Sequence, residues 1–195
     1  MHAEFALGER QMKARNLYRT ILGVGFVLLF GVAIAQQNQK SAEPKYIPAS
    51  PAGWRVTGDD TLGAFSFSEV ILQPGSGPPE PHRHSREDEL WYILEGELEF
   101  RIGERGERTF VAGPGATVFG PRGVPHFFKA VGTNPASYVF VISPAGFERF
   151  FAERTQLEKE IPRTDPSFAA RSKVLRDKYG LEVSSDWSFP PIGKN

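Results

Sequence analysis

Short runs of alternating apolar and polar residues, each bounded by turns rich in Gly, Pro or Asp, fill the chain from Gly53 to Ser143. Such alternation indicates β-strands, because successive side chains of a strand point to opposite faces. Seven candidate strands with no helix between them favour an all-β barrel or sandwich over an α/β fold. The predicted strands are Ala64–Leu72, Glu89–Leu94, Glu97–Ile102, Thr109–Ala112, Ala116–Phe119, His126–Val131 and Ser137–Ile142.

The period of the pattern changes after Ser143, where apolar residues recur at helical spacing. Ser143 and Pro144 suit the N-cap and first position of a helix that Pro162 would end. A second helix is predicted from Asp165-Pro166 to Gly180, a residue suited to a left-handed C-cap. We expect the two helices to cover one end or face of the barrel, with a partner surface as the alternative; their apolar stripes contain Phe147, Phe150, Phe151, Leu157, Phe168, Leu175 and Tyr179.

The N-terminal segment resembles an export signal. Basic residues precede an uncharged, largely apolar run from Thr20 to Ala35 that ends in a small-x-small sequence, which predicts a signal peptide cleaved after Ala35. The product would be periplasmic or secreted, or membrane-anchored by residues 20–35 if cleavage fails. Residues 36–50 are predicted to be a flexible lead-in. Starting at Met12 would give a cleaner basic region, so residues 1–11 are a candidate mis-assigned start.

The composition excludes several classes of function. Basic and acidic residues number 23 each, so no positive surplus indicates nucleic acid as a partner. The chain has no cysteine, which excludes thiolate ligands and cysteine nucleophiles. It also lacks a Gly-rich phosphate loop after a strand, so no nucleotide cofactor is indicated. Any metal must bind through nitrogen and oxygen.

Three of the four histidines lie together with one carboxylate in a pattern that suits a metal ion. His82 and His84 are two residues apart, so on a strand their imidazoles point to the same side. Glu89 follows after four residues, and His126 follows the turn-like run Pro121-Arg122-Gly123. Four such donors suit one divalent ion of Fe, Mn, Ni, Co, Cu or Zn, among which the sequence does not choose. Singly, each residue has an ordinary structural interpretation, as a polar core histidine or a solvated charge.

The spacing of these residues resembles the two motifs of the cupin superfamily. His82, His84, Glu89 and Gly96 match the first motif, and residues 115–126, ending in His126, match the second. Two positions depart from the pattern: Ser76 replaces a lead glycine, and Ala130 replaces an asparagine. Neither position is a ligand in the family. Residues 143–151 and 178–182 resemble the C-terminal extension of small quercetin-dioxygenase-like cupins.

This resemblance implies a double-stranded β-helix, or jelly-roll barrel, at residues 51–146, followed by a helical extension at 147–195. It also implies a metal near the mouth of the barrel and, often, a homodimer. If Glu89 points inward, strand alternation brings Trp91 and Ile93 inward with it, and Phe128 shares the parity of His126. We therefore expect a substrate pocket lined by these three residues and Phe100, with Leu98 and Ile102 on the same wall as Phe100. The alternative is that these side chains simply fill a small barrel.

Two classes of function follow for a small-molecule ligand. The first is a dioxygenase in which Glu89 is both a metal ligand and a proton acceptor, acting on an organic substrate that coordinates through oxygen. The second is a non-catalytic binding or sensing module outside the cytoplasm. A metal-dependent isomerase or epimerase is a third possibility. The shared fold cannot choose among them.

Overall fold

The computed structural model describes residues 42, 44–48, 53–183, 187 and 189. The predicted signal segment and most of the predicted lead-in therefore lie outside the described residues. Within the described part of the chain, no helix is both long and apolar enough to cross a membrane.

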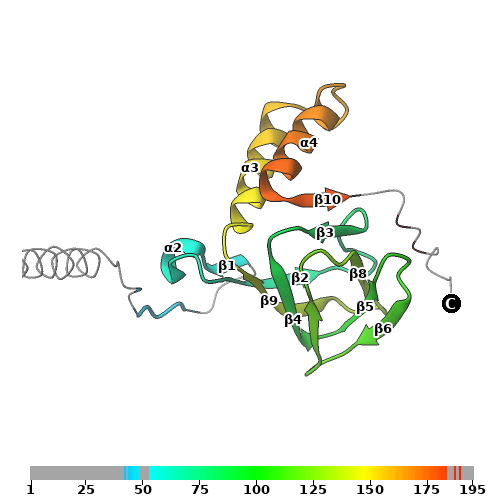
Figure 1. The fold of residues 1–195 in the computed structure, drawn as a ribbon. Helices are drawn as coiled ribbons and strands as arrows, with labels where there is room; N and C mark the ends of the chain where they lie inside the picture. The colour runs from blue at the N-terminus through cyan, green and yellow to red at the C-terminus, as the bar shows by residue number, and fades with distance from the viewer. Residues whose placement is uncertain (1–41, 43, 49–52, 184–186, 188, 190–195) are drawn as a thin grey trace, which may run out of the picture. The chain divides into compact units, whose positions relative to one another are not determined.

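Two antiparallel sheets, each of five strands among the described residues, face one another to form the barrel (Figure 1). The first has the order β1-β2-β9-β4-β7 and the second the order β10-β3-β8-β5-β6. The strands are β1 (Gly53–Val56), β2 (Ser66–Leu72), β3 (His82–His84), β4 (Asp88–Glu95), β5 (Glu97–Ile102), β6 (Arg108–Ala112), β7 (Thr117–Gly120), β8 (His126–Val131), β9 (Ala136–Ser143) and β10 (Leu181–Val183).

The predicted all-β fold is confirmed, and all seven predicted strands are present with ends shifted by at most two residues. Turns at Gly103–Gly106 and Gly113–Gly115 join β5 to β6 and β6 to β7. The pattern missed β1, β3 and β10, which have three or four residues each, because a run this short gives only weak evidence of a period. It also missed α2 (Gly58–Thr61), a single helical turn between β1 and β2 that Thr57 and Asp60 cap reciprocally.

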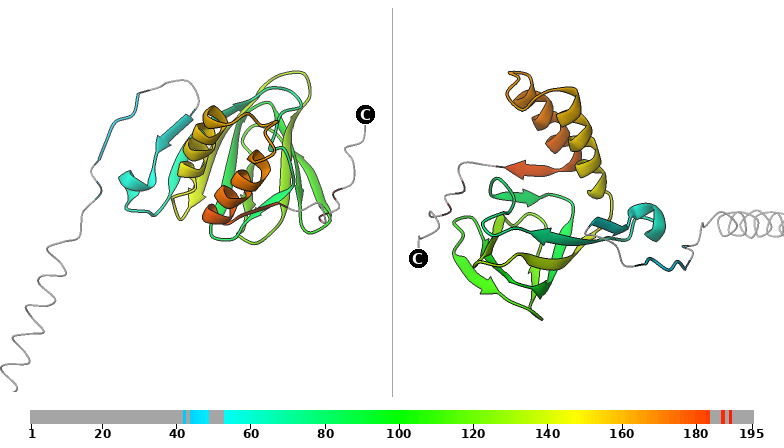
Figure 2. Two further views of the ribbon diagram at one scale, coloured as in Figure 1. Left: turned by 90° about the horizontal axis from the view of Figure 1, so that it is seen from above. Right: turned by 180° about the vertical axis from the view of Figure 1, so that it is seen from behind.

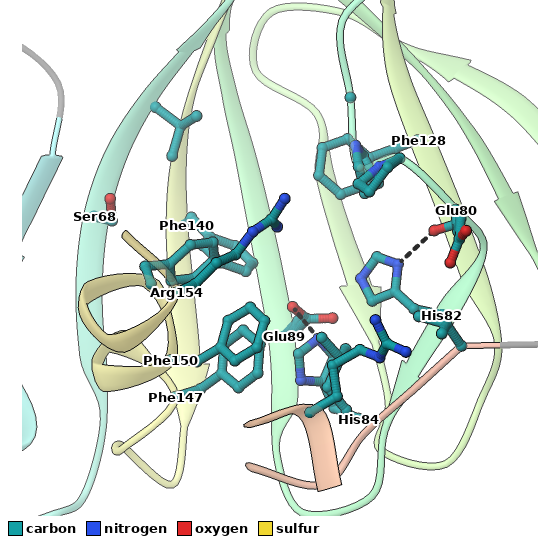
Figure 3. A pocket seen from close by; sticks show the side chains of 18 of the residues that line it. Ser68, Glu80, His82, His84, Glu89, Phe128, Phe140, Phe147, Phe150 and Arg154 are labelled. Carbon is teal, nitrogen blue, oxygen red and sulfur yellow. Dashed lines mark hydrogen bonds and ion pairs between the residues drawn. The ribbon is translucent and has the colours of Figure 1, made fainter. Parts of the chain in front are cut away.

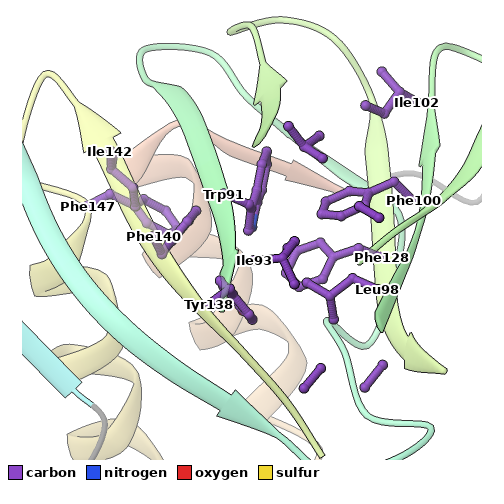
Figure 4. Packing of buried hydrophobic residues seen from close by; sticks show 14 of the residues in the cluster. Trp91, Ile93, Leu98, Phe100, Ile102, Phe128, Tyr138, Phe140, Ile142 and Phe147 are labelled. Carbon is purple, nitrogen blue, oxygen red and sulfur yellow. The ribbon is translucent and has the colours of Figure 1, made fainter. Parts of the chain in front are cut away.

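Strand alternation places one set of side chains between the two sheets (Figure 4). Trp91, Ile93, Leu98 and Phe100 have no exposed surface, whereas Tyr92 on the opposite face of β4 is exposed. Burial of large aromatic and aliphatic side chains supplies most of the free energy that holds the sheets together. The inward parity predicted from Glu89 and His126 is therefore confirmed.

Two helices, α3 (Glu148–Glu160) and α4 (Phe168–Tyr179), lie against each other at one end of the sheets (Figures 1 and 2). The predicted start of the first helix is wrong. Ser143 is still paired with Asp88 as the last residue of β9, and its hydroxyl donates to the carbonyl of Ala64, so it is not a helix cap. The second helix also begins later than predicted, because Asp165 accepts hydrogen bonds from Ser167 in a turn that precedes it.

The end of α4 is as predicted. Gly180 has φ of 67°, a left-handed conformation that favours glycine, and its N–H bonds the last turn of the helix. The chain then reverses into β10, which pairs with β3. Phe147 and Phe150 belong to the buried core, and Leu175 and Tyr179 pack against it. The helices thus cover one end of the barrel, as expected from their apolar stripes.

Candidate metal centre

Three strands from both sheets supply the four side chains singled out by the sequence. His82 and His84 lie on β3 and His126 on β8, and His82 is the residue of β3 that pairs with His126. Glu89 lies on β4 in the opposite sheet. Glu89 and the three histidines all point between the sheets, so their four side chains meet at one point of the barrel. Figure 3 shows three of them, His82, His84 and Glu89, from close by.

The convergence is close. Each of the four residues offers one ligand atom, and these atoms all lie within 4.8 Å of one another. Nε2 of His84 is 3.3 Å from Oε1 of Glu89, and Nε2 of His126 is 2.8 Å from Oε2. His84, Glu89 and His126 are each at most 3% exposed, and His82 closes the mouth side as a half-buried residue.

Two of these buried atoms lack a hydrogen bond. Oε2 of Glu89 and Nε2 of His126 are close, but their mutual orientation does not satisfy hydrogen-bond geometry. A buried polar atom without a partner costs about 1 to 3 kcal/mol, so such atoms generally have a further ligand. A divalent cation among the four donors would satisfy both atoms, and three imidazoles with one carboxylate suit such an ion. The residues present therefore fit one metal ion.

The other ring nitrogens hold the imidazoles in the orientation that a metal needs. Nδ1 of His82 lies 3.1 Å from the carbonyl oxygen of Glu80, and Nδ1 of His126 lies 3.1 Å from that of Val124. A backbone acceptor for the Nδ1 proton fixes the tautomer whose bare Nε2 can bind a cation. Both rings are thereby set with Nε2 directed at the centre.

Glu87 lies behind His84, on the side of the ring away from Glu89, and sequence analysis missed it. Its Oε2 lies 3.6 Å from Nδ1 of His84, both groups are buried, and neither has a hydrogen-bond partner. A carboxylate behind a metal-binding imidazole raises its basicity and holds its orientation. Glu87 is two residues before Glu89, so strand parity was the signal that could have found it.

The charges of the site favour an ionised carboxylate beside neutral and protonated imidazoles. Burial, with help from the neighbouring histidines, lowers the pKa of His82 to about 3. Burial alone would raise the pKa of Glu89, but His84 and His126 outweigh it and lower the value to about 2. Burial opposes the charged form of His126 as well, yet Glu89 prevails and raises its pKa. A bound cation would compete with a proton for the Nε2 atom of His126.

Aromatic side chains support the ligands from outside. The ring of Phe147 lies edge-on to His84 at 4.3 Å between centroids, and the ring of Trp91 lies edge-on to His126 at 5.5 Å. Gly77 permits a further close approach, because a Cβ there would overlap the carbonyl oxygen of Phe128 on β8. Gly75 has a left-handed backbone conformation, which favours glycine. The two glycines that flank Ser76 therefore supply the special backbone conformation and the close approach, and the residue between them need not be glycine.

A cavity of about 630 Å³ opens from the metal centre toward α3, α4 and β10. Its floor includes His82, His84 and Glu89, and much of its wall is aromatic (Figure 3). This volume is in the usual range for small-molecule sites. Three arginines of the helical segment, which sequence analysis did not single out, also line it: Arg154, Arg163 and Arg176. Exposed arginines on helices give no sequence signal that separates them from ordinary surface charges.

The structure places the four expected pocket residues in two different environments. Phe128 lines the cavity. Trp91, Ile93 and Phe100 do not; they are fully buried in the hydrophobic core that Figure 4 shows. Their inward direction was deduced correctly, but at their depth the barrel is narrow enough for side chains to fill it. The cavity is instead completed by residues outside the strands, including Phe147 and Phe150 of the helical segment.

Comparison with known proteins agrees with this geometry. The family model described as "Cupin domain" matches residues 68–142, a range that contains all four candidate ligands. Residues 68–142 form a cupin domain. The fold is accordingly a mainly β cupin fold of two antiparallel sheets with C-terminal helices.

Curated proteins that the chain is similar to include plant germin-like proteins. The chain is 36% identical over 85 residues to germin-like protein subfamily 2 member 2 of Arabidopsis thaliana, covering 43% of this chain and 38% of that protein. It is 33% identical over 100 residues to germin-like protein 1-1 of Oryza sativa subsp. japonica, covering 46% and 45%. The chain thus spans less than half the length of these curated relatives. Among solved structures, a cupin protein of Bacteroides fragilis is 19% identical with a TM-score of 0.44, covering 55% of this chain and 88% of that one.

Proposed function

We propose that this cupin is a metal-dependent dioxygenase that acts on a small organic substrate coordinating through oxygen. One observation carries the proposal: four donors converge, two of them with unsatisfied buried atoms, and three of the four line a cavity large enough for a small molecule. A domain that used its metal for stability alone would have no need of such a cavity beside it.

Different residues of the chain would have different roles in the proposed reaction. His82, His84, Glu89 and His126 would hold the ion, which when bound would supply Lewis acidity and, if redox-active, electrons for dioxygen. Glu89 would also accept the proton that an enol or hydroxy-ketone substrate loses, since it is the buried carboxylate among the described residues that line the cavity. The aromatic wall would exclude water from the reacting atoms.

The lining of the cavity favours this proposal over an isomerase or epimerase. Proton transfer between two carbon atoms requires positioned acid and base groups beside the substrate. Among the described residues that line the cavity, the carboxylates are Glu89, which is a candidate ligand, and Glu80, which is exposed. Tyr138 also lines it, and burial raises the pKa of its hydroxyl, which opposes its use as a base. A reaction centred on the metal needs fewer acid and base groups than an isomerase or epimerase does, and it therefore fits this cavity lining better.

The test begins with metal analysis of protein purified without a histidine tag. We expect about one metal ion per chain in the wild type and none in the His82→Ala, His126→Ala double variant. Glu95→Gln is a matched control, since Glu95 is an exposed residue of the same strand as Glu89. A wild type that takes up no metal after reloading would contradict the proposal at its base.

Activity is then measured as oxygen consumption. Each reloaded metal form is tested against a panel of flavonols and β-diketones, and labelled dioxygen shows whether both oxygen atoms enter the product. Turnover that continues without oxygen would indicate an isomerase or lyase instead. Ligand binding with no turnover under any condition would favour the binding or sensing module.

We further propose that the protein is exported, on the basis of the basic and apolar pattern that ends at Ala35. Sequencing the N-terminus of the protein from separated cell fractions tests this proposal. Cleaved protein beginning at Gln36 outside the cytoplasm supports it, an intact chain in the membrane fraction supports the anchored alternative, and an intact chain in the cytoplasm overturns both.

A further inference from the structure

The wall of the cavity opposite the metal centre carries a local excess of positive charge. Arg154 on α3, Arg176 on α4 and Arg163 in the loop between them all line the cavity. The chain as a whole has equal numbers of basic and acidic residues, so this concentration is not a consequence of overall composition. Three guanidinium groups facing one small-molecule site form a positive potential that attracts anions.

One carboxylate serves two of these arginines. Oε1 of Glu158 accepts from Nε of Arg154 at 3.0 Å and from Nη2 of Arg163 at 2.7 Å. Arg154 makes this contact through its Nε alone, and its Nη atoms have no acceptor among the described residues, so they are left for a ligand. Figure 3 shows this side chain reaching from α3 toward the middle of the cavity. Arg154 is half-buried, which strengthens its interaction with any anion that displaces water there.

Arg176 has no carboxylate partner among the described residues. Its Nη1 donates to the hydroxyl of Ser172 at 3.2 Å, and Ser172 lines the same cavity. Other basic residues of the two helices are neutralised on the far side, where Arg171 pairs with Glu160 and Lys178 with Glu153. The helical wall of the cavity therefore keeps a formal excess of two positive charges, three arginines against one glutamate.

The other residues that line the cavity indicate what the uncharged part of the ligand is like. Aromatic rings of Phe140, Phe147 and Phe150 line the space between the arginines and the metal centre. This surface favours an apolar or aromatic body. At the floor, the metal would take an oxygen donor of the ligand. A complementary molecule thus has an anionic end, an apolar middle and a metal-binding oxygen.

We infer that the natural substrate is an amphipathic organic anion, a carboxylate whose charged group is bound by Arg154 and Arg176 on the helical segment. This inference rests on the proposed function, because it assigns the substrate class of that same site. A guanidinium group binds a carboxylate through charge-assisted hydrogen bonds with matching planar geometry. The helical segment would thus select the substrate, while the barrel holds the metal.

The experiment compares two probes that differ in charge and little in shape, 3-(4-hydroxyphenyl)propionate and its neutral amide, 3-(4-hydroxyphenyl)propionamide; each has a phenol oxygen for the metal at one end and the carboxylate or amide at the other. Binding to the full-length protein is measured by calorimetry, and the metal content of every preparation is determined. We expect the wild type to prefer the carboxylate by about tenfold or more, the range given by one or two hydrogen bonds to a charged group. The Arg154→Gln, Arg176→Gln double variant should lose this preference and bind the amide as the wild type does.

Two controls separate charge from structure. Arg171→Gln removes a helical arginine that faces away from the cavity, and it should keep the full preference. Arg176→Lys keeps the charge without the planar fork, and it should retain part of the preference.

Equal binding of the two probes by metal-loaded wild type, or no binding of either, would overturn the inference. A preference that survives the double substitution would do the same, since the metal alone would then be selecting the anion. Absence of metal would instead contradict the proposed function, and the loss of preference in the double variant would still report separately on the arginines.

Discussion

Glu148 offers a quantitative test of how the helical segment is joined to the barrel. It is 7% exposed at the first position of α3, and its two oxygens accept different backbone N–H groups. Oε1 accepts from Gly58 at 2.9 Å, and Oε2 accepts from Gly146 at 2.7 Å. One side chain therefore links α2, the turn after β9 and the start of α3, the helix that carries Arg154.

Replacing Glu148 by alanine removes both bonds and leaves two partly buried N–H groups without this acceptor. Hydrogen bonds to a charged group contribute about 1.5 to 3 kcal/mol each when buried, and partial access of water reduces this, so we expect a loss of roughly 2 to 4 kcal/mol in the free energy of unfolding. For a domain of this size that corresponds to a fall in Tm of roughly 5 to 15 °C. The exposed Lys159 of the same helix is the control, and Lys159→Ala should change stability by less than about 0.5 kcal/mol.

The pH dependence gives a second readout. Burial would raise the pKa of Glu148, but the N–H groups of Gly58 and Gly146 outweigh it and lower the pKa below its ordinary value of 4.5. A lowered pKa means that the charged group stabilises the fold above pH 4.5 and that this contribution is lost as pH falls through the lower, folded-state value. Glu148→Gln should therefore be less stable than the wild type at pH 7, with a difference that shrinks in acid.

The assay is reversible unfolding in urea at several pH values, analysed as a two-state transition. An alanine variant within 0.5 kcal/mol of the wild type at pH 7 would refute the proposed link. So would a gap between wild type and Glu148→Gln that stays constant from pH 7 into the acid range, because the stabilisation would not then come from the ionised carboxylate.

Three further results are expected. Glu87→Gln should lower metal affinity by about 10- to 100-fold in a competition assay with a chromogenic chelator, because His84 loses its charged support, while Glu95→Gln should not change it; equal affinities would exclude the positioning role of Glu87. Trp91→Phe should cost only about 1 to 2 kcal/mol of stability, since the lost packing is partly offset by removal of a buried indole N–H that has no partner, and a loss above about 4 kcal/mol would contradict this account. Metal added at 100 times its Kd should stabilise the protein by about 2.7 kcal/mol, measured as a rise in Tm that the His82→Ala, His126→Ala variant does not show.

Much of the barrel could be predicted because its strands obey one simple rule. The alternation in β4 and β8 gave both the direction of Glu89 and His126 and the burial of the residues that share their parity. Three of the four candidate ligands lie close together in the sequence, on β3 and β4, and His126 on β8 could be added because the histidines are few and it follows a turn-like run.

The parts that could not be predicted depend on contacts between distant segments. β10 becomes a strand because β3 offers it an edge, and no feature of Leu181–Val183 itself required that. The cavity wall was misplaced for a similar reason: parity says that Trp91 points inward but not how deep the barrel is filled. The arginine wall depends on how α3 and α4 pack onto the barrel, which periodicity alone does not determine.

The pairing of β3 connects the C-terminal extension to the strand that carries two of the candidate metal ligands. β3 pairs with β10 along its whole length, in the register Leu181 with His84 and Val183 with His82, but it pairs with β8 only at His126. The C-terminal extension is therefore not an accessory module attached to a self-sufficient barrel. Exchanging it between related proteins would change ion affinity together with ligand choice, so the two properties would have to evolve, or be engineered, as one unit.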